Sequence, residues 1–483
     1  MNPGETQTTF TASGGGKPRI GILFVTSGWF REVGLQDPSG DTTARVEQLA
    51  RETVQRLSEF LEPVYPGVLF SVEEARKAGR AIRAAGVEGL LVSPLMWCED
   101  QIVRAALAEL PSMPLLLWTY SPESALPEFV PFQRMIQGSG AVCTLQLSGM
   151  LRREGVRYRS VVGPRDDEEV YREIARHVRT LAVAADLRGL RVGVLPFPCD
   201  QMSTTYVDEF GLRRLYGVEL RYLELERVRR TAAEVQEGEI ADFRVGIEAA
   251  GQRIKVDERS LEEGIRYALA LEAVLAEERL PVLAMNDVIE EMHASFGLRP
   301  CLANPRLSDS GAVIAMEADV AAGVCMYVLR RALSQSPMYT ETFSVDYRAN
   351  ALLLGHAGYH DTANADPEYP VEIVADVEYE NSDRFPGAVS FFKYRAGPVT
   401  VVNSVWDGGA LKWVAFEGVS LEGPPKMDGN CHLFCRPDIP VRDFFRRSVE
   451  SGVSQHWIVV YGCHLETLAG LCEGLGIAYL PLS

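Results

Sequence analysis

Two carboxylates stand where an apolar, strand-like run meets an apolar, helix-like segment. In VIAMEADVAAGVCMYVLRRAL, residues 313–333, Glu317 and Asp319 follow the apolar residues 312–316. An ionised carboxylate in apolar surroundings is costly unless it is paired or coordinated. Helix capping is one explanation, because an acid at a helix N-terminus contributes about 0.3–1 kcal/mol and Asp319 is a good N-cap residue. The other explanation is a cation that these acids hold.

Histidines and further acids occupy comparable places elsewhere in the chain. His356 ends the apolar run ALLLGHAG, His456 begins the apolar run HWIVVYG, and Glu290 and Glu291 follow AMNDVI. Taken singly, each fits an ordinary solvated helix face, turn histidine or core histidine. Taken together, two carboxylates and two imidazoles can enclose an octahedral divalent ion that keeps open positions for substrate oxygens.

Motifs for other common chemistries are absent from the 483-residue sequence. The segment TSGWFREVG lacks the glycine spacing of a dinucleotide-binding loop, and no Walker, HExxH or GxSxG motif occurs. The CHLFC segment, residues 431–435, has no second ligand pair for a structural zinc ion, so we expect a strand edge there. The net charge of −18 opposes binding to nucleic acid or to an anionic membrane.

The nine scattered cysteines favour reduced thiols in a cytoplasmic protein. The polar, Gly/Thr-rich N-terminus lacks the features of a signal peptide, and no uncharged apolar run reaches about 18 residues. We therefore expect a cytoplasmic protein without a membrane span.

Alternating strand and helix patterns must position the candidate residues. They predict two doubly wound, parallel α/β sheets followed by a mainly β region. Ligands of such sheets lie at the carboxyl ends of the strands. Four residues near predicted strand ends are therefore candidates for substrate binding, in addition to Glu317: Trp29, Gln101, Gln201 and Trp406. The predicted organisation is a disordered leader (1–17), a first α/β domain (18–164), a second α/β domain carrying the catalytic acids (165–338) and a mainly β C-terminal domain (339–483).

The segments around these residues resemble the L-fucose/L-arabinose isomerase superfamily, and its fucose isomerase-like branch most closely. The resemblance covers about residues 18–483, is strongest over 285–358 and includes no short diagnostic motif. It is carried by SFGLRPCLANPRLSDSGAVIAMEADVAAGVCMYVLRRALSQSP, ALLLGHAG and QHWIVVYG, and in the first domain by GILFVTSGWF, LLVSPLMWCEDQ and LLLWTYSPE.

The resemblance implies an aldose–ketose isomerase that uses manganese. The ligand types, carboxylate oxygens with imidazoles, also suit manganese, with magnesium, iron(II) or cobalt as alternatives. The resemblance also implies a homotrimer or homohexamer with the active site at a subunit interface, and a monosaccharide as the partner. His464 stands where relatives often carry an acid. The implied roles are Glu291 and Asp319 as acid/base pair and metal ligands, His356 and His456 as further ligands, and Glu317 as an alternate ligand or neighbouring acid.

Isomerisation requires removal of a weakly acidic proton beside a carbonyl and stabilisation of the enediolate that results. Ile289 and Glu290 replace the aromatic-rich turn usual in this branch, which leaves the sugar undetermined. Two other functions stay open: epimerisation of a sugar or sugar acid through the same enediolate, and sugar binding without catalysis.

Overall fold

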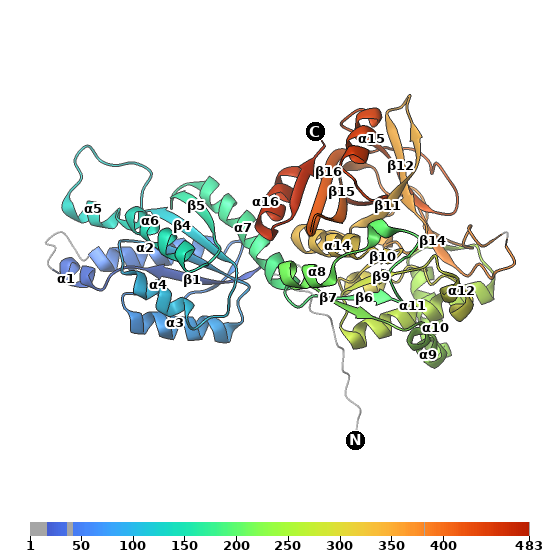
Figure 1. Cartoon of the computed structure of the whole chain (residues 1–483), viewed down its shortest axis with the longest axis horizontal. Helices are drawn as coiled ribbons and strands as arrows, with labels where there is room; N and C mark the ends of the chain where they lie inside the picture. The colour runs from blue at the N-terminus through green and yellow to red at the C-terminus, as the bar shows by residue number, and fades with distance from the viewer. Residues whose placement is uncertain (1–16, 36–41, 381, 483) are drawn as a thin grey trace, which may run out of the picture. The chain divides into compact units, whose positions relative to one another are not determined.

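The structure is a computed structural model that describes residues 17–35, 42–380 and 382–482 (Figure 1). The expected leader lies outside these ranges, apart from Lys17. The chain forms two compact units that divide between Asp186 and Leu187, and each is described by itself. The domain boundaries expected at 164/165 and 338/339 stay predictions.

The first unit is built on a five-stranded sheet in which every pairing is parallel, in the order β2-β1-β3-β4-β5. Its strands are β1 (Arg19–Val25), β2 (Glu62–Val64), β3 (Gly89–Pro94), β4 (Leu115–Ser121) and β5 (Arg159–Pro164). Its helices are α1 (Trp29–Leu35), α2 (Thr42–Leu57), α3 (Val72–Ala85), α4 (Asp100–Leu107), α5 (Phe132–Gln137), α6 (Gly140–Arg153) and α7 (Glu168–Leu187).

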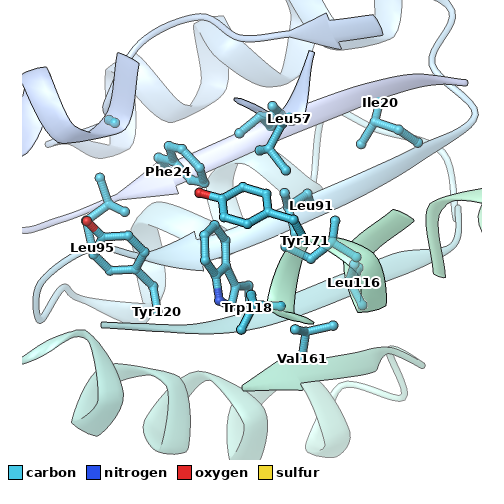
Figure 2. Packing of buried hydrophobic residues seen from close by; sticks show 14 of the residues in the cluster. Ile20, Phe24, Leu57, Leu91, Leu95, Leu116, Trp118, Tyr120, Val161 and Tyr171 are labelled. Carbon is cyan, nitrogen blue, oxygen red and sulfur yellow. The ribbon is translucent and has the colours of Figure 1, made fainter. Parts of the chain in front are cut away.

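Helices cover both faces of this sheet, which explains why β1 is apolar at successive positions. Ile22 and Phe24 join a cluster with α2 and α7 around Trp118, whose indole N–H donates to the carbonyl of Gly163 (Figure 2). Leu23 belongs to a second cluster with α3, α4 and α6. Successive residues of a strand point to opposite faces, so this sheet is doubly wound.

The second unit begins with a four-stranded parallel sheet in the order β10-β9-β6-β7. Its strands are β6 (Arg191–Leu195), β7 (Glu219–Tyr222), β9 (Val282–Met285) and β10 (Val313–Met316). The helices of this part are α8 (Glu209–Tyr216), α9 (Leu225–Glu234), α10 (Glu237–Ala249), α11 (Glu258–Glu278), α12 (Glu290–Phe296), α13 (Pro305–Asp309) and α14 (Val320–Leu333), with the 3-10 turn η1 (Ser203–Thr205) after β6.

Six antiparallel strands then close into a barrel, in the order β15-β18-β11-β12-β17-β16 and back to β15. They are β11 (Met338–Asp346), β12 (Ala351–His356), β15 (Gly397–Asp407), β16 (Ala410–Ser420), β17 (Cys431–Pro437) and β18 (His456–Tyr461). Each contributes side chains to one apolar interior, among them Met338, Leu352, Val401, Val414, Leu433 and Trp457.

Further elements complete the second unit. Helix α14 contacts strands of both the parallel sheet and the barrel. The small sheet β14-β13-β8 joins the α/β part to the segment that follows β12. The remaining elements are β8 (Arg253–Ile254), η2 (Thr362–Asn364), β13 (Glu372–Val374), β14 (Val389–Phe391), α15 (Val441–Glu450), α16 (Leu465–Leu475) and β19 (Ala478–Pro481), which pairs in parallel with β16.

The predicted fold class is confirmed, with two parallel α/β sheets followed by a mainly β part that forms an antiparallel barrel. The apolar segment GVLFSV, residues 67–72, has the composition of a strand but forms only an isolated bridge between Leu69 and Val25, and β2 is the edge strand. Pro66 and Gly67, with φ of 108° at the glycine, interrupt the extended chain there.

The cysteines are all free thiols and eight of the nine are buried, as their apolar contexts suggest. Within the ranges that the structure describes, no helix combines the length and the apolar composition needed to cross a membrane.

Candidate metal centre

The turn between β10 and α14 is shaped by two consecutive residues with left-handed backbone conformation. Glu317 has φ of 57° and Ala318 has φ of 53°. Such conformations cost roughly 1–2 kcal/mol for residues with a side chain. Hydrogen bonds hold the turn: Glu317 N–H donates to Asp287 Oδ1 at 2.9 Å, and Ala318 N–H donates to the carbonyl of Met285 at 2.9 Å. The end of β9 therefore fixes the turn that carries Glu317.

Asp319 caps the N-terminus of α14, so the expected capping role is confirmed. Its Oδ1 accepts from Ala322 N–H at 2.9 Å, and the residue is fully buried. Its other oxygen, Oδ2, lies 2.7 Å from Nδ1 of His456. The same carboxylate therefore ends a helix and orients an imidazole.

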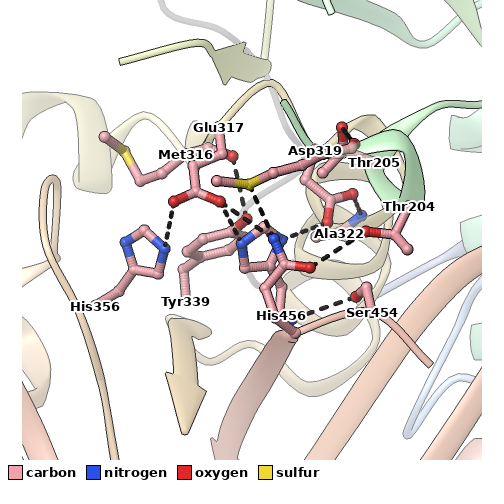
Figure 3. Close-up of polar contacts among 12 residues, drawn as sticks. Thr204, Thr205, Met316, Glu317, Asp319, Ala322, Tyr339, His356, Ser454 and His456 are labelled. Atoms are coloured by element: carbon pink, nitrogen blue, oxygen red, sulfur yellow. Dashed lines mark hydrogen bonds and ion pairs between the residues drawn. The ribbon is translucent and has the colours of Figure 1, made fainter. Parts of the chain in front are cut away.

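The barrel brings two histidines to this turn (Figure 3). His356 is the last residue of β12, and His456 is the first residue of β18. The ring of Tyr339 lies 4.8 Å, between ring centroids, from each imidazole, and its hydroxyl donates to the carbonyl of Met316. Tyr339 thus packs both imidazoles against the end of β10.

Among the described residues, one group has the composition and spacing of a metal site: Glu317, His356 and His456. One ligand atom from each lies within 4.8 Å of the others, and all three residues are buried. Oε2 of Glu317 is 2.8 Å from Nε2 of His456, and Oε1 is 3.7 Å from Nε2 of His356.

The tautomer of His356 follows from its neighbours. Its Nδ1 is hydrogen-bonded to the carbonyl of Ala357, and because a carbonyl only accepts, Nδ1 carries the proton. Burial lowers the pKa of His356 to about 3, so the ring is neutral and Nε2 has a lone pair. This buried nitrogen has no hydrogen-bond partner and faces Oε1 of Glu317. A cation or a water molecule placed between these two acceptors would satisfy both.

His456 lies between two carboxylates. Burial alone would lower the pKa of His456, but its hydrogen bonds to Asp319 and Glu317 raise it to about 9. Burial would likewise raise the pKa of Glu317, yet the hydrogen bond from His456 and the positive charge of that imidazolium hold it below its usual value. A metal at Nε2 would replace one proton, with Asp319 keeping the proton on Nδ1, as outer carboxylates commonly do for metal-bound histidines.

Gln455 is a member of the site that sequence analysis missed. Its Nε2 donates to Oε2 of Glu317 at 3.4 Å and contacts the sulfur of Met202 at 3.0 Å. Its Oε1 accepts from the hydroxyl of Thr204 at 3.2 Å. The segment after β6 therefore lies against the centre, and the only sequence signal was adjacency to His456.

The predicted acidic residues do not all lie at the candidate metal centre. Glu317 is the carboxylate placed between the two imidazoles, whereas Asp319 supports His456 from outside the group. Glu291 is exposed on α12 and is not part of the group that the described residues form. The acid that comes closest from this side is Asp287, which is buried and paired with Arg299 at 3.3 Å. Helix α12 begins at Glu290 and carries Glu291 to the exposed surface, whereas Asp287 lies two residues after the end of β9.

The predicted substrate residues occupy varied places. Trp29 begins α1 and is 54% exposed, and Gln101 is exposed on α4, both in the first unit. Gln201 is exposed next to the segment that covers Gln455. Trp406 is half-buried and packs against Gly211 of α8.

The remaining candidates from the sequence, His464 and the CHLFC segment, use their side chains in hydrogen bonds to main-chain groups. His464 Nε2 is hydrogen-bonded to the carbonyl of Tyr461 at 2.7 Å. The CHLFC segment lies in β17, which is not an edge strand because it pairs with both β12 and β16. Both nitrogens of His432 bind main-chain groups, of Asn430 and Lys426, and Cys431 Sγ donates to the carbonyl of Ser390.

No protein-family model and no curated protein matches this sequence. The resemblance to the L-fucose/L-arabinose isomerase superfamily therefore stays a prediction, and inference about function begins from the geometry of Glu317, His356 and His456.

Proposed function

We propose that Glu317, His356 and His456 bind a divalent metal ion, and that the protein is a metal-dependent aldose–ketose isomerase acting on a monosaccharide. The observation that carries the metal is the 3.7 Å approach of two acceptors, Nε2 of His356 and Oε1 of Glu317. The sequence resemblance supplies the choice of reaction.

Two imidazole nitrogens and one carboxylate oxygen suit Mn²⁺, Fe²⁺ or Co²⁺ better than Mg²⁺, which prefers oxygen ligands. The resemblance favours manganese. The same donor set is typical of non-haem iron(II) enzymes, so iron belongs in any metal panel. When bound, such an ion supplies Lewis-acid stabilisation of the negative charge that develops on sugar oxygens as the enediolate forms.

The residues of the chain prepare this site before any ligand arrives. The Ala357 carbonyl fixes the His356 tautomer, and Asp319 fixes the orientation of His456. The Tyr339 ring packs against both imidazoles. Residues held in this way lose little freedom when a ligand binds, which favours affinity. A homo-oligomer with the active site at a subunit interface remains part of the proposal, on the resemblance alone.

Chelation followed by reloading tests the proposal. We expect the chelated protein to bind Mn²⁺ in calorimetry, and the reloaded protein to convert at least one aldose of a broad panel into its ketose, with proton exchange at C2 in deuterium oxide. Glu317→Gln should abolish both, whereas Glu368→Gln, a change at an exposed carboxyl of the same unit, should alter neither.

Other outcomes assign other functions. Exchange at C2 without ketose formation would indicate an epimerase. Thermal stabilisation by a sugar but not by Mn²⁺ would indicate a binding protein. Absence of divalent-ion binding, with equal behaviour of Glu317→Gln and the parent protein, would refute the metal centre itself.

A further inference from the structure

Proton transfer in the proposed reaction needs a carboxylate that substrate can reach, and two acids at the centre do not qualify. Asp319 is fully buried, with its oxygens engaged by Ala322 N–H and His456. Asp287 is also buried, with its oxygens engaged by Glu317 N–H and Arg299. Neither can accept a proton from a sugar carbon without losing a contact that holds the site together.

Glu341 is a carboxylate of a different kind. It lies on β11, directly opposite His456 in the antiparallel pairing of β11 with β18. Directly opposite residues place their side chains on one face, with Cβ atoms roughly 4.5–5.5 Å apart. Met338 points into the barrel, so alternation puts Tyr339 and Glu341 on the outer face, and Trp457 in the interior puts His456 there too.

The side chain of Glu341 is half-buried, and within the described part of the chain it forms no hydrogen bond or ion pair. It is therefore both accessible and unengaged. On the neighbouring strand β12 its partner is Gly355, which has no side chain to cover it. Glu341 is thus a partly exposed carboxylate that lies beside His456 on this face of the barrel.

We infer that Glu341 is the catalytic base that moves the proton between the two carbons of the sugar, an assignment that rests on the proposed isomerase function. The carboxylate takes the proton from C2 of the aldose. The C–H bonding pair becomes the C1–C2 double bond of the enediolate, and the carbonyl π pair moves to O1. The same carboxyl group returns the proton to C1, while the O2 proton passes to O1, so no oxidant or reductant is consumed.

Burial raises the pKa of Glu341, and the negative charge of Glu317 raises it further, against the opposing charge of His456. Glu291, to which the sequence resemblance assigns this step, is exposed on α12.

Glu341→Gln tests the inference, because it keeps the shape of the side chain and removes its basicity. With Mn²⁺ restored, we expect proton exchange at C2 to fall by about 10²–10⁴-fold, the usual contribution of a positioned base. The Mn²⁺ dissociation constant measured by calorimetry should stay within about threefold of the parent value, since Glu341 is not a member of the ligand group. Glu368→Gln is the matched control and should change neither quantity.

Formate provides a second readout that a purely structural role would not produce. Glu341→Ala opens space for a small carboxylate, and we expect formate to restore part of the exchange in this variant but none in Glu317→Gln. Exchange by Glu341→Gln within tenfold of the parent protein would overturn the assignment, and so would a large loss of Mn²⁺ affinity in that variant. If the parent protein binds Mn²⁺ but exchanges no sugar proton, the proposed isomerase function fails first, and the assignment fails with it.

Discussion

His456 holds a proton at the position where a metal ion would bind. The imidazole is hydrogen-bonded at Nδ1 to Asp319 and at Nε2 to Glu317, with distances of 2.7 and 2.8 Å. In the metal-free protein it is an imidazolium that compensates two buried carboxylates. A proton and a metal ion therefore compete for the same nitrogen, and the acidity of His456 controls the outcome.

We predict that Mn²⁺ affinity rises with pH. The pKa of His456 is about 9 in the metal-free protein, so below that pH each bound ion must displace one proton. His356, with a pKa of about 3, is already neutral and adds no proton above about pH 4. The apparent affinity should increase by roughly tenfold per pH unit and level off near pH 9. Calorimetry in two buffers of different ionisation enthalpy measures the released proton.

In the chelated protein, the contribution of His456 to the free energy of unfolding falls as pH rises, whereas Mn²⁺ affinity rises with pH. The folded-state pKa of His456 is raised above its ordinary value of 6.5, so its contribution is fully present below about pH 6.5 and is lost as pH rises towards 9. His456→Gln should remove this part of the pH dependence. A metal affinity independent of pH between 6 and 8 would contradict the protonated state assigned here.

At the scale of the element, the turn from β10 into α14 performs two tasks. Asp319 caps the helix through Oδ1 and supports His456 through Oδ2. An asparagine can still cap a helix, but it carries no charge with which to hold the imidazole proton. The two tasks can therefore be separated by substitution.

We predict that Asp319→Asn weakens Mn²⁺ binding by about 10–100-fold, the usual effect of removing an outer carboxylate, while the helix cap is retained. Asp319→Ala should weaken binding similarly and also lower the free energy of unfolding by a further 0.5–2 kcal/mol or so, because the cap is lost as well. Calorimetry and denaturant unfolding measure the two effects. Equal unfolding free energies of the two variants would show that the cap contributes nothing.

The sequence predicted those parts of the site that depend only on residues close together in the chain. The apolar run before Glu317 and the helix over 320–333 predict the turn and its N-cap, and the structure has both. The position of Glu317 between the two imidazoles, with Asp319 outside them, was not predictable, because it depends on two left-handed residues held by Asp287 and by the carbonyl of Met285. Glu341 was missed for a related reason: its place opposite His456 depends on pairing between strands that are distant in the chain.

At the scale of the whole molecule, the first unit presents unusual apolar exposure. Six large apolar side chains between residues 126 and 145 are from 51% to 81% exposed: Leu126, Phe129, Phe132, Met135, Val142 and Leu145. Exposed apolar residues concentrated in one short segment commonly mark a protein–protein contact. This segment is the natural place to test the proposed homo-oligomer.

We predict that Phe129→Asp together with Leu145→Asp lowers the molar mass measured by light scattering, because each change places a charge in a buried apolar contact. Val449→Asp is the matched control, since Val449 is 76% exposed on α15 of the other unit. The prediction is contradicted if the parent protein is already a monomer. It is also contradicted if the double variant has the same molar mass as the parent protein.

The pairing of Glu317 with His456 joins positions that are 139 residues apart in the chain. His356, between them in sequence, adds a third attachment point. Seen from the unfolded state, an ion bound by all three would act as a reversible cross-link that closes two long loops at once. Metal loading should therefore make the parallel sheet and the barrel melt as one cooperative block, whereas chelation leaves α14 and its apolar packing as the bridge between them.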